Sequence, residues 1–319
     1  MPESVVYSII VPAYNEELVI LESYNRLKKV MDDINEPYEI IFVNDGSRDK
    51  TADIINGICE KDKNVKMLDF SRNFGHQTAI TAGMDYASGK AIVVIDADLQ
   101  DPPEVIPQMI EKWKEGYDVV YGKRIKRQGE TFFKKFTAKV FYRFLRKMTD
   151  VDIPVDTGDF RLIDRKVCDA LKKVNERNRY IRGIISWLGF KQIGVEFTRD
   201  KRFAGETKYP LKKMLKFAFD AITSFSYKPL KLASYAGFIL SFVSFIYLVV
   251  VLIQKLFIGR TVAGWASIIA INLFFNGIVL IILGIIGEYI GRIYDEAKGR
   301  PLYIIRQFTN FPDDVEGRK

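Results

Sequence analysis

Two long runs without a formal charge lie toward the C-terminal end of this 319-residue chain. The first is Leu232–Gln254, of 23 residues, and the second is Thr261–Gly287, of 27 residues. At about 1.5 Å per residue, either run would be longer as a helix than the roughly 30 Å hydrocarbon core of a membrane. Two buried helices of a soluble domain are the alternative, but uncharged runs of this length are unusual there. The sequence therefore predicts two transmembrane helices, 232–254 and 261–287.

Positively charged residues flank these runs unevenly. Five lysines lie between residues 212 and 231, and four cations lie between residues 292 and 306, whereas the loop between the runs carries only Lys255 and Arg260. Because Lys and Arg concentrate on the cytoplasmic side of membranes, both ends of the chain are expected in the cytoplasm. The predicted parts are a cytoplasmic domain (1–210), a juxtamembrane amphipathic helix (211–231), the membrane hairpin (232–287) and a cytoplasmic C-terminal tail (288–319).

Apolar, β-branched stretches alternate with helical patterns over the first 125 residues. Such alternation is typical of βαβ units, so we expect an α/β fold, with a mostly parallel, Rossmann-like sheet and flanking helices. Ligands of such sheets bind at the carboxyl ends of the strands. The predicted strands are Val5–Val11, Tyr38–Val43, Val65–Phe70, Ala91–Ile95 and Asp118–Tyr121, and the predicted helices are Glu16–Asp32, Thr51–Lys61, Gln77–Ala87 and Pro103–Glu115.

The segment 123–147 carries ten cations and a single acid, Glu130. Phe132, Phe136 and Phe144 recur at helical spacing within it, which places an aromatic stripe beside a basic face. A basic amphipathic helix of this kind suits the interface of an anionic membrane. A helix packed on the sheet with a solvated cationic face is the alternative. Nucleic acid is not an expected partner, because the chain carries no known binding motif for it.

Acidic residues follow three of the predicted strands. Pro12-Ala13-Tyr14-Asn15-Glu16 follows the first strand. Asp45-Gly46-Ser47 follows the second strand and also fits an ordinary turn that leads into a helix. Asp96-Ala97-Asp98 follows the fourth strand, where two carboxylates one residue apart would repel each other unless a cation lay between them or their pKa values rose. Divalent cations such as Mg²⁺ take oxygen ligands from one or two carboxylates and from substrate phosphates.

Three motifs in this order, together with the two apolar runs, resemble the family 2 glycosyltransferases of the polyprenyl-phosphate type. The motifs are Val11–Glu16 (VPAYNE), Asn44–Ser47 (NDGS) and Asp96–Pro103 (DADLQDPP), and the resemblance covers about residues 5–305. Dolichyl-phosphate mannose synthases and GtrB-type undecaprenyl-phosphate glucosyltransferases belong to this group. The resemblance implies a GT-A domain at the cytoplasmic face of a bacterial inner membrane. It also implies inverting transfer of a hexose, with glucose from UDP-glucose favoured, to undecaprenyl or dolichyl phosphate, although the motifs themselves do not fix the sugar.

The resemblance also assigns donor-side residues. A carboxylate of the pocket would accept from the base or ribose, and the ring of Tyr14 would pack nearby. The metal, Mg²⁺ or Mn²⁺, would be held by Asp98 and Gln100, with Asp96 touching the ribose or the metal's water shell. The residues implied for the nucleotide sugar are Pro12, Tyr14, Glu16, Asp45, Asp96, Arg124 and Lys208.

On the acceptor side, the segment 156–162 matches the family's acceptor motif. Asp159, or Asp156 if the loop turns otherwise, is expected nearest the acceptor, with Arg161 and Arg202 among the catalytic residues. A basic loop with Arg199, Arg202 and Lys208 matches one that closes over phosphates, and a solvated surface run of charge is its alternative.

The chemistry can be argued from the substrate class. A lipid monophosphate has a second pKa of about 6, so its oxygen is mostly a dianionic nucleophile at neutral pH. The reaction therefore requires charge neutralisation more than a strong base, and Arg124, Arg161 and Arg202 are candidates for it. In this interpretation Asp159 orients rather than deprotonates. His76, the only histidine, is expected to be a helix-start residue rather than a catalytic group.

Two other functions are compatible with parts of the sequence. A processive polysaccharide synthase is disfavoured because the chain lacks a Gln-x-x-Arg-Trp motif and has few predicted spans. A non-catalytic nucleotide-binding scaffold or flippase partner is disfavoured because it would not need a metal site. Gly284, Gly287 and Gly291 lie near one helix face and favour a homo-oligomer, although close packing within the hairpin explains them as well.

Overall fold

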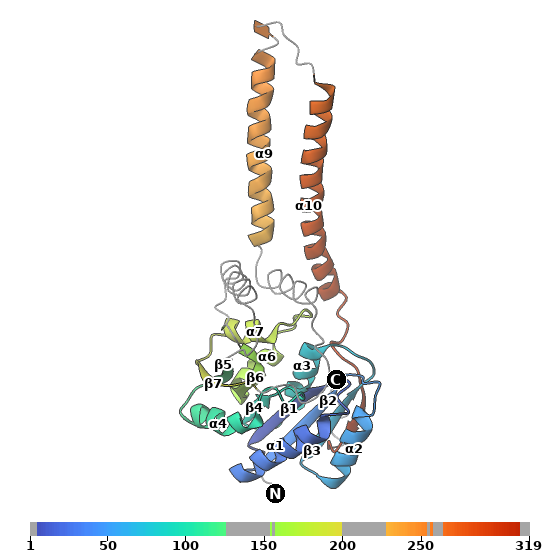
Figure 1. Cartoon of the computed structure of the whole chain (residues 1–319), viewed down its shortest axis with the longest axis vertical. Coiled ribbons are helices and arrows are strands. Elements are labelled where there is room, and N and C mark those ends of the chain that lie inside the picture. Colours follow the sequence, from blue (N-terminus) through green and yellow to red (C-terminus); the bar gives the residue numbers. More distant parts are fainter. Residues whose placement is uncertain are drawn as a thin grey trace. The chain divides into compact units, whose positions relative to one another are not determined.

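The computed structural model describes residues 5–125, 154, 157–199, 228–253, 256–257 and 264–312. The chain forms two compact units, one containing the sheet and one containing the helix hairpin (Figure 1). Several sequence predictions fall outside the described residues. These are the basic segment from residue 126 onward, the juxtamembrane helix up to residue 227, Asp156, Arg202 and Lys208.

The first unit is built on one mixed sheet of eight described strands in the order β7-β5-β6-β4-β1-β2-β3-β8. Strands β4, β1, β2 and β3 are parallel to one another, as are β5 and β7. Strand β6 is antiparallel to both of its neighbours, and β8 is antiparallel to β3. The strands are β1 (Tyr7–Ala13), β2 (Tyr38–Asn44), β3 (Val65–Phe70), β4 (Ala91–Val94), β5 (Val119–Arg124), β6 (Thr157–Asp164), β7 (Gln192–Phe197) and β8 (Ile305–Thr309).

Helices cover both faces of this sheet, which confirms the expected α/β class. Every residue of β1 and β2 is buried, as is typical of parallel strands covered on both sides. Helices α1, α2 and α4 pack with one face, and α3, α6 and α7 with the other. The helices of this unit are α1 (Ile20–Ile34), α2 (Thr51–Lys61), α3 (His76–Tyr86), α4 (Ile106–Lys114, preceded by the short 3₁₀ turn η1, Pro103–Val105), α6 (Arg165–Lys172) and α7 (Ile181–Trp187).

Helix α1 begins later than the sequence pattern suggests. The carbonyl oxygen of Glu16 accepts hydrogen bonds from the backbone N–H groups of Val19 (3.0 Å) and Ile20 (2.9 Å), which forms a separate turn before the helix. The backbone N–H of Glu16 donates to Thr51 Oγ1 at 2.8 Å. Glu16 is therefore held beside the start of α2 rather than inside α1.

The second unit contains α9 (Lys228–Ile253) and α10 (Trp265–Ala297). Among the described helices, one stretch is long and apolar enough to cross a membrane, Phe274–Ala297 within α10, with a mean hydropathy of 1.9. Helix α9 contributes a shorter apolar stretch, Gly237–Tyr247. Large apolar side chains are exposed on both helices, as on Phe238 and Leu280. Exposed apolar surface of this extent indicates a lipid or protein environment.

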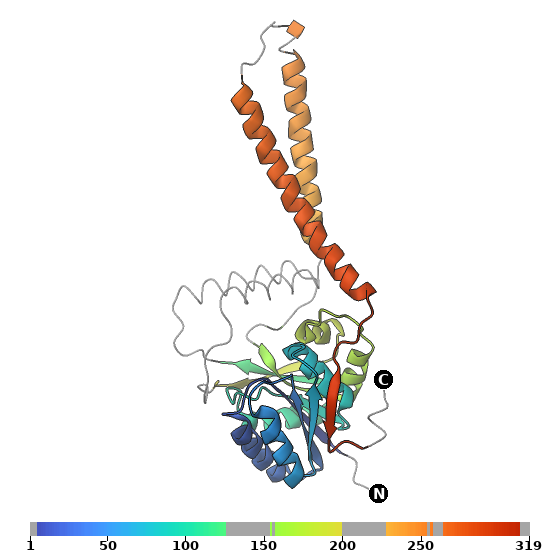
Figure 2. The same ribbon diagram turned by 90° about the vertical axis from the view of Figure 1, so that its right-hand side faces the viewer.

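The C-terminal residues differ from the predicted tail. Helix α10 continues ten residues beyond the predicted end of the apolar run, to Ala297. Residues 305–309 then form β8 at the edge of the sheet, shown in red in Figure 2. The chain thus leaves the first unit, forms the hairpin, and returns to the same sheet.

Candidate active site

The residues of the predicted site lie where strands β1, β2 and β4 end. Ala13 at the end of β1 is paired with Asn44 at the end of β2, and β4 runs parallel to β1 on its other side. From β1 the chain continues to β2 and β3 on one side and then crosses to β4 on the other side. The carboxyl edge between β1 and β4 is therefore a topological switch point, which is the usual ligand site of an open α/β sheet. Tyr14 and Asp45 follow β1 and β2 directly, and Asp96 follows β4 after one intervening residue.

Asp45 is buried beneath a loop that follows β3. Its carboxylate accepts hydrogen bonds from the backbone N–H groups of Phe74 (2.6 Å) and Gly75 (3.0 Å). Burial raises the pKa of Asp45, and the two amide donors only partly oppose this. Gly46 has a positive φ of 65°, and a Cβ there would lie 2.4 Å from the carbonyl carbon of Arg72. Glycine is thus required for the loop to approach Asp45.

The loop after β1 is fastened to the same turn. The backbone N–H of Asn15, which has a positive φ of 53°, donates to Ser47 Oγ at 3.0 Å. Because Glu16 is also held by Thr51, the loop containing Pro12, Tyr14 and Glu16 lies against the turn of Asp45. The structure therefore brings the predicted nucleotide residues of the first two strands together.

A strained turn follows β4. The backbone N–H of Gln100 donates to Asp98 Oδ1 at 3.1 Å, and Leu99 between them is buried with a positive φ of 57°. A left-handed conformation costs a residue such as leucine about 1–2 kcal/mol, and strain of this kind is concentrated at functional sites. The turn thus presents Asp98 and Gln100 at the carboxyl edge of the sheet.

The side-chain oxygens of this turn are suitable ligands for a hard divalent cation. Among the described residues no donor forms a hydrogen bond with the buried Asp96 Oδ1, which lies 3.4 Å from His76 Nε2. Burial raises the pKa of Asp96 to about 6 although the charge of His76 opposes this, and a bound divalent cation would compensate the carboxylate further. The described residues contain no cluster of three or more His, Cys, Asp or Glu ligands. Mg²⁺ needs no such cluster, because it uses one or two carboxylates together with substrate phosphates and water.

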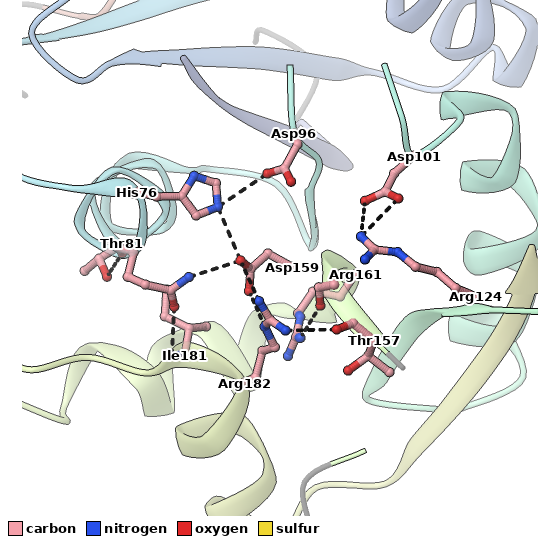
Figure 3. Close-up of polar contacts among 12 residues, drawn as sticks. His76, Thr81, Asp96, Asp101, Arg124, Thr157, Asp159, Arg161, Ile181 and Arg182 are labelled. Atoms are coloured by element: carbon pink, nitrogen blue, oxygen red, sulfur yellow. Dashed lines mark hydrogen bonds and ion pairs between the residues drawn. The ribbon is translucent and has the colours of Figure 1, made fainter. Parts of the chain in front are cut away.

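His76 lies between two acidic side chains (Figure 3). Its Nε2 is 3.4 Å from Asp96 Oδ1 and 3.3 Å from Asp159 Oδ2. Burial lowers the pKa of His76, but the charge of Asp96 and the hydrogen bond with Asp159 outweigh this effect and raise it to about 9. His76 is the first residue of α3, as expected for a helix-start residue, and it also connects β4 to β6.

Asp159 is surrounded by donors. Arg182 Nε lies 2.8 Å from Asp159 Oδ1, and Gln77 Nε2 lies 3.1 Å from Oδ2. Burial alone would raise the pKa of Asp159, but the charge of Arg182 and the contact with His76 hold it well below its usual range. Arg182 and Gln77 were not among the predicted site residues, because neither lies in a motif and their pairing with Asp159 depends on the tertiary fold.

Three further arginines approach the site from β5, β6 and the end of β7. Arg161 is buried, donates to the carbonyl oxygen of Gly158 at 2.9 Å, and has a pKa lowered by burial to about 10. Arg124 Nη2 and Arg199 Nε lie 3.2 Å and 3.5 Å from the buried carboxylate of Asp101. A Cβ at Gly158 would lie 2.6 Å from Arg124 Nη2, so glycine leaves room for this guanidinium group.

The geometry thus contains two groups of side chains at one edge of the sheet. One group, around Asp45, holds the turns after β1 and β2. The other brings the acids Asp96 and Asp159 together with cationic side chains, as Figure 3 shows. Of the predicted site residues, Asp156, Arg202 and Lys208 lie outside the part of the chain that the structure describes.

Comparison with known proteins defines the class of this enzyme. A family model described as glycosyl transferase family 2 matches residues 8–172, and a model described as the GtrB C-terminal hairpin matches residues 228–293. Because the first match covers more than half of the chain, the chain belongs to glycosyl transferase family 2. It is a glycosyltransferase with a GT-A-like sheet and a C-terminal helix hairpin.

Relatives are similar over nearly the full length. The chain is 66% identical over 307 residues to the uncharacterized glycosyltransferase YkcC of Bacillus subtilis (strain 168), which covers 96% of this chain and 95% of the relative. It is 43% identical over 301 residues to the bactoprenol glucosyl transferase of Shigella phage SfV, covering 94% and 97%. Among solved structures, glucosyl-3-phosphoglycerate synthase from Mycobacterium tuberculosis matches with a TM-score of 0.49 and 17% identity over 69% of this chain and 76% of that one.

Proposed function

We propose that this enzyme transfers a glucosyl group from UDP-glucose to a polyprenyl phosphate, with inversion at the anomeric carbon and with Mg²⁺ or Mn²⁺ as cofactor. The observation that carries the proposal is the meeting of the acidic turn after β4 with guanidinium groups of β5, β6 and α7, of which Arg161 is buried, at one sheet edge. Relatives that are named bactoprenol glucosyl transferases support this choice of sugar and lipid.

On the donor side, the turn of Asp45 and the loop of Tyr14 and Glu16 would bind the nucleoside. Asp98 and Gln100, with Asp96, would hold the cation. When bound, a divalent cation neutralises the diphosphate and the leaving UDP. The left-handed conformation of Leu99 fixes the turn in advance, so these oxygens need little rearrangement when the donor binds.

On the acceptor side, an oxygen of the lipid phosphate would attack the anomeric carbon while the bond to UDP breaks. The attacking phosphate is mostly dianionic at neutral pH, so no proton has to be removed from it. Asp159 is a poor candidate for a general base, since its pKa is held far below neutral pH. Its contacts with Arg182 and His76 suit an orienting role. Arg124, Arg161 and Arg199 would bring positive charge to the two phosphates.

We further propose that both predicted spans cross the membrane, with the sheet-containing unit on the cytoplasmic side of a bacterial inner membrane. The cation-rich flanks of the hairpin and the match of residues 228–293 to a hairpin model support this orientation and this number of crossings. Among the described residues no atom lies within 4 Å of the place of a Cβ at Gly284, Gly287 or Gly291, which supports close approach of a second copy of the chain there.

The test is transfer by the purified full-length protein in detergent. Radiolabelled UDP-glucose, UDP-galactose, UDP-N-acetylglucosamine and GDP-mannose are each incubated with polyprenyl phosphate and Mg²⁺ or Mn²⁺. We expect label in an organic-extractable lipid from UDP-glucose alone, and none when EDTA replaces the metal. Label in a water-soluble polymer would contradict the proposal and favour a processive synthase.

Replacement of a single proposed metal ligand tests the metal assignment. Asp98→Ala should lower the transfer rate by about 100-fold or more, because the charge of the diphosphate is then left without its counter-ion. Glu115→Ala, which removes an exposed surface carboxylate, is the matched control and should keep the wild-type rate. Equal rates in Asp98→Ala and wild type would refute the metal assignment.

A further inference from the structure

The segment that follows the helix hairpin contacts the turns that hold Asp45. We propose that Arg306 and Tyr303 are positioning residues of the nucleotide pocket, acting through Asp69 and Phe70 at the end of β3. The inference rests on the proposed function, because it takes Asp45 as part of the donor site. It assigns to the C-terminal segment a role in donor binding in addition to completing the sheet.

Arg306 acts on the first of these turns through two buried polar side chains. Its Nε and Nη2 lie 2.9 Å and 2.6 Å from Asp69 Oδ2. The other oxygen, Asp69 Oδ1, accepts a hydrogen bond from Asn44 Nδ2 at 2.7 Å. Asn44 Oδ1 in turn accepts from the backbone N–H of Ser47 at 3.4 Å, across the turn that contains Asp45. A continuous chain of contacts therefore runs from β8 to the donor turn.

Tyr303 acts on the second turn through aromatic contacts. Its ring stacks on Phe70 with a centroid distance of 5.4 Å and an interplanar angle of 10°. Phe70 meets the ring of Phe74 edge to face at 5.6 Å, and the backbone N–H of Phe74 donates to Asp45. The backbone N–H of Ser71 also donates to the carbonyl oxygen of Ile304 at 3.0 Å. The loop over Asp45 is thus fixed from the side of the C-terminal segment.

The placement of Arg306 gives it a local effect on the donor turn as well as a part in stability. Its side chain is 61% exposed, so solvent weakens its ion pair with Asp69. Asp69, by contrast, is almost fully buried and lies at the carboxyl end of β3, next to the site. Removal of Arg306 would leave a buried carboxylate oxygen without these two donors and free the Asn44 side chain to shift.

The test compares variants of the full-length protein in detergent. Binding of UDP and of GDP is measured by titration calorimetry, and KM and kcat are measured with UDP-glucose and polyprenyl phosphate. Arg306→Ala should weaken UDP binding and raise KM for the donor by about tenfold, with kcat changed by less than about twofold, because only the donor turn is loosened. Arg306→Lys should recover part of this loss. Gln307→Ala, an exposed neighbour on the same strand, is the control and should bind UDP as the wild type does.

A double-mutant cycle tests whether Arg306 affects UDP binding through Asp69. If Arg306 acts through Asp69, the variant that combines Arg306→Ala with Asp69→Asn should bind UDP no more weakly than Asp69→Asn alone. Unchanged UDP affinity and KM in Arg306→Ala, or a loss confined to thermal stability and the active fraction, would overturn the inference. Wild-type protein that binds UDP but does not transfer glucose to polyprenyl phosphate would contradict the proposed function alone. Wild-type protein that binds neither nucleotide would overturn both.

Discussion

At the scale of single residues, some buried carboxylates in this protein accept from several donors each, and Glu39 is an example. Glu39 on β2 is almost fully buried and accepts from Ser8 Oγ (2.5 Å), the backbone N–H of Ser88 (2.7 Å) and Lys66 Nζ (2.6 Å). Burial alone would raise the pKa of Glu39, but the charge of Lys66 and these donors lower it. Glu39 lies at the amino end of its strand, opposite the site edge, so its role is structural.

We expect Glu39→Gln to lower the free energy of unfolding by about 2–3 kcal/mol at pH 7, because it leaves Lys66 without its buried partner. The pKa of Glu39 in the folded chain is below its ordinary 4.5, so the stabilisation is complete above that pH and is lost as the pH falls through the folded-state value. Thermal unfolding of wild type and variant should therefore converge in acid. Glu36→Gln, which affects a more exposed carboxylate paired with Lys114, is the control and should change stability by less than about 1 kcal/mol. A constant difference from pH 7 to pH 3 would contradict this account.

At the scale of elements, helix α3 carries His76 and Gln77 to the site, and its distance from the sheet is set by a glycine. A Cβ at Gly83 would lie 2.3 Å from Ile10 Cγ2, and Ile10 is fully buried on β1. Helix α2 contains a contrasting glycine, Gly57, with open space where its Cβ would be. The two positions separate the effect of packing from that of helix propensity.

Gly83→Ala should destabilise the protein by about 1–2 kcal/mol, because overpacking against Ile10 exceeds the gain in helix propensity. Displacement of α3 should also reduce transfer activity. Gly57→Ala should instead raise stability by about 0.5–1 kcal/mol and leave activity unchanged. Thermal unfolding and rate measurements on both variants check this, and equal effects of the two substitutions would show that α3 tolerates a wider spacing.

Sequence patterns predicted the elements whose burial depends on residues that are close together in the sequence. Strands β1–β5 were predicted to within a few residues, because apolar β-branched runs flanked by turns need no distant partner to be recognised. Strand β6 was not predicted as a strand, since it carries Asp159 and Arg161, whose burial depends on the distant Arg182 and on Gly158. Strand β8 was also missed, because five mixed residues give no clear alternation and its partner β3 lies far away in sequence.

The candidate site also contains residues that could be predicted from the sequence and residues whose contacts depend on the tertiary fold. Acids at strand ends could be located from sequence, because the carboxyl ends of parallel strands share one edge. The position of His76 between Asp96 and Asp159 could not, since it depends on how α3 and β6 meet across the sheet. Asp101 as the common partner of Arg124 and Arg199 likewise required the arrangement of β5 beside β7.

At the scale of the whole molecule, the return of the chain to its own sheet constrains the membrane topology. Strands β7 and β8 belong to one sheet, and the hairpin lies between them in sequence. A segment that starts and ends on one side of a membrane must cross it an even number of times. If α10 crosses, a second crossing must therefore exist, and the apolar stretch of α9 is the candidate.

Cysteine labelling should report this topology. Cysteines introduced at Glu60 and Arg300, both exposed, should react with a membrane-impermeant maleimide only after the membrane is opened. Cysteine at Gly264, which precedes α10, should react in intact cells. The native Cys59 and Cys168 are buried and should give little background. Reaction of Arg300→Cys and Gly264→Cys from the same side would exclude a membrane-crossing α10.

The position of β8 after the helix hairpin in the sequence also governs the order in which the sheet forms. Ribosomes release the chain from its N-terminus, so β3 emerges early, with its outer edge unpaired, and stays so until residues 305–309 have been synthesised. Because β8 follows α9 and α10 in the sequence, it leaves the ribosome after both apolar helices. The sheet is therefore completed only after the whole hairpin has emerged, and a nascent chain that has exposed no more than the hairpin still lacks the strand that carries Arg306.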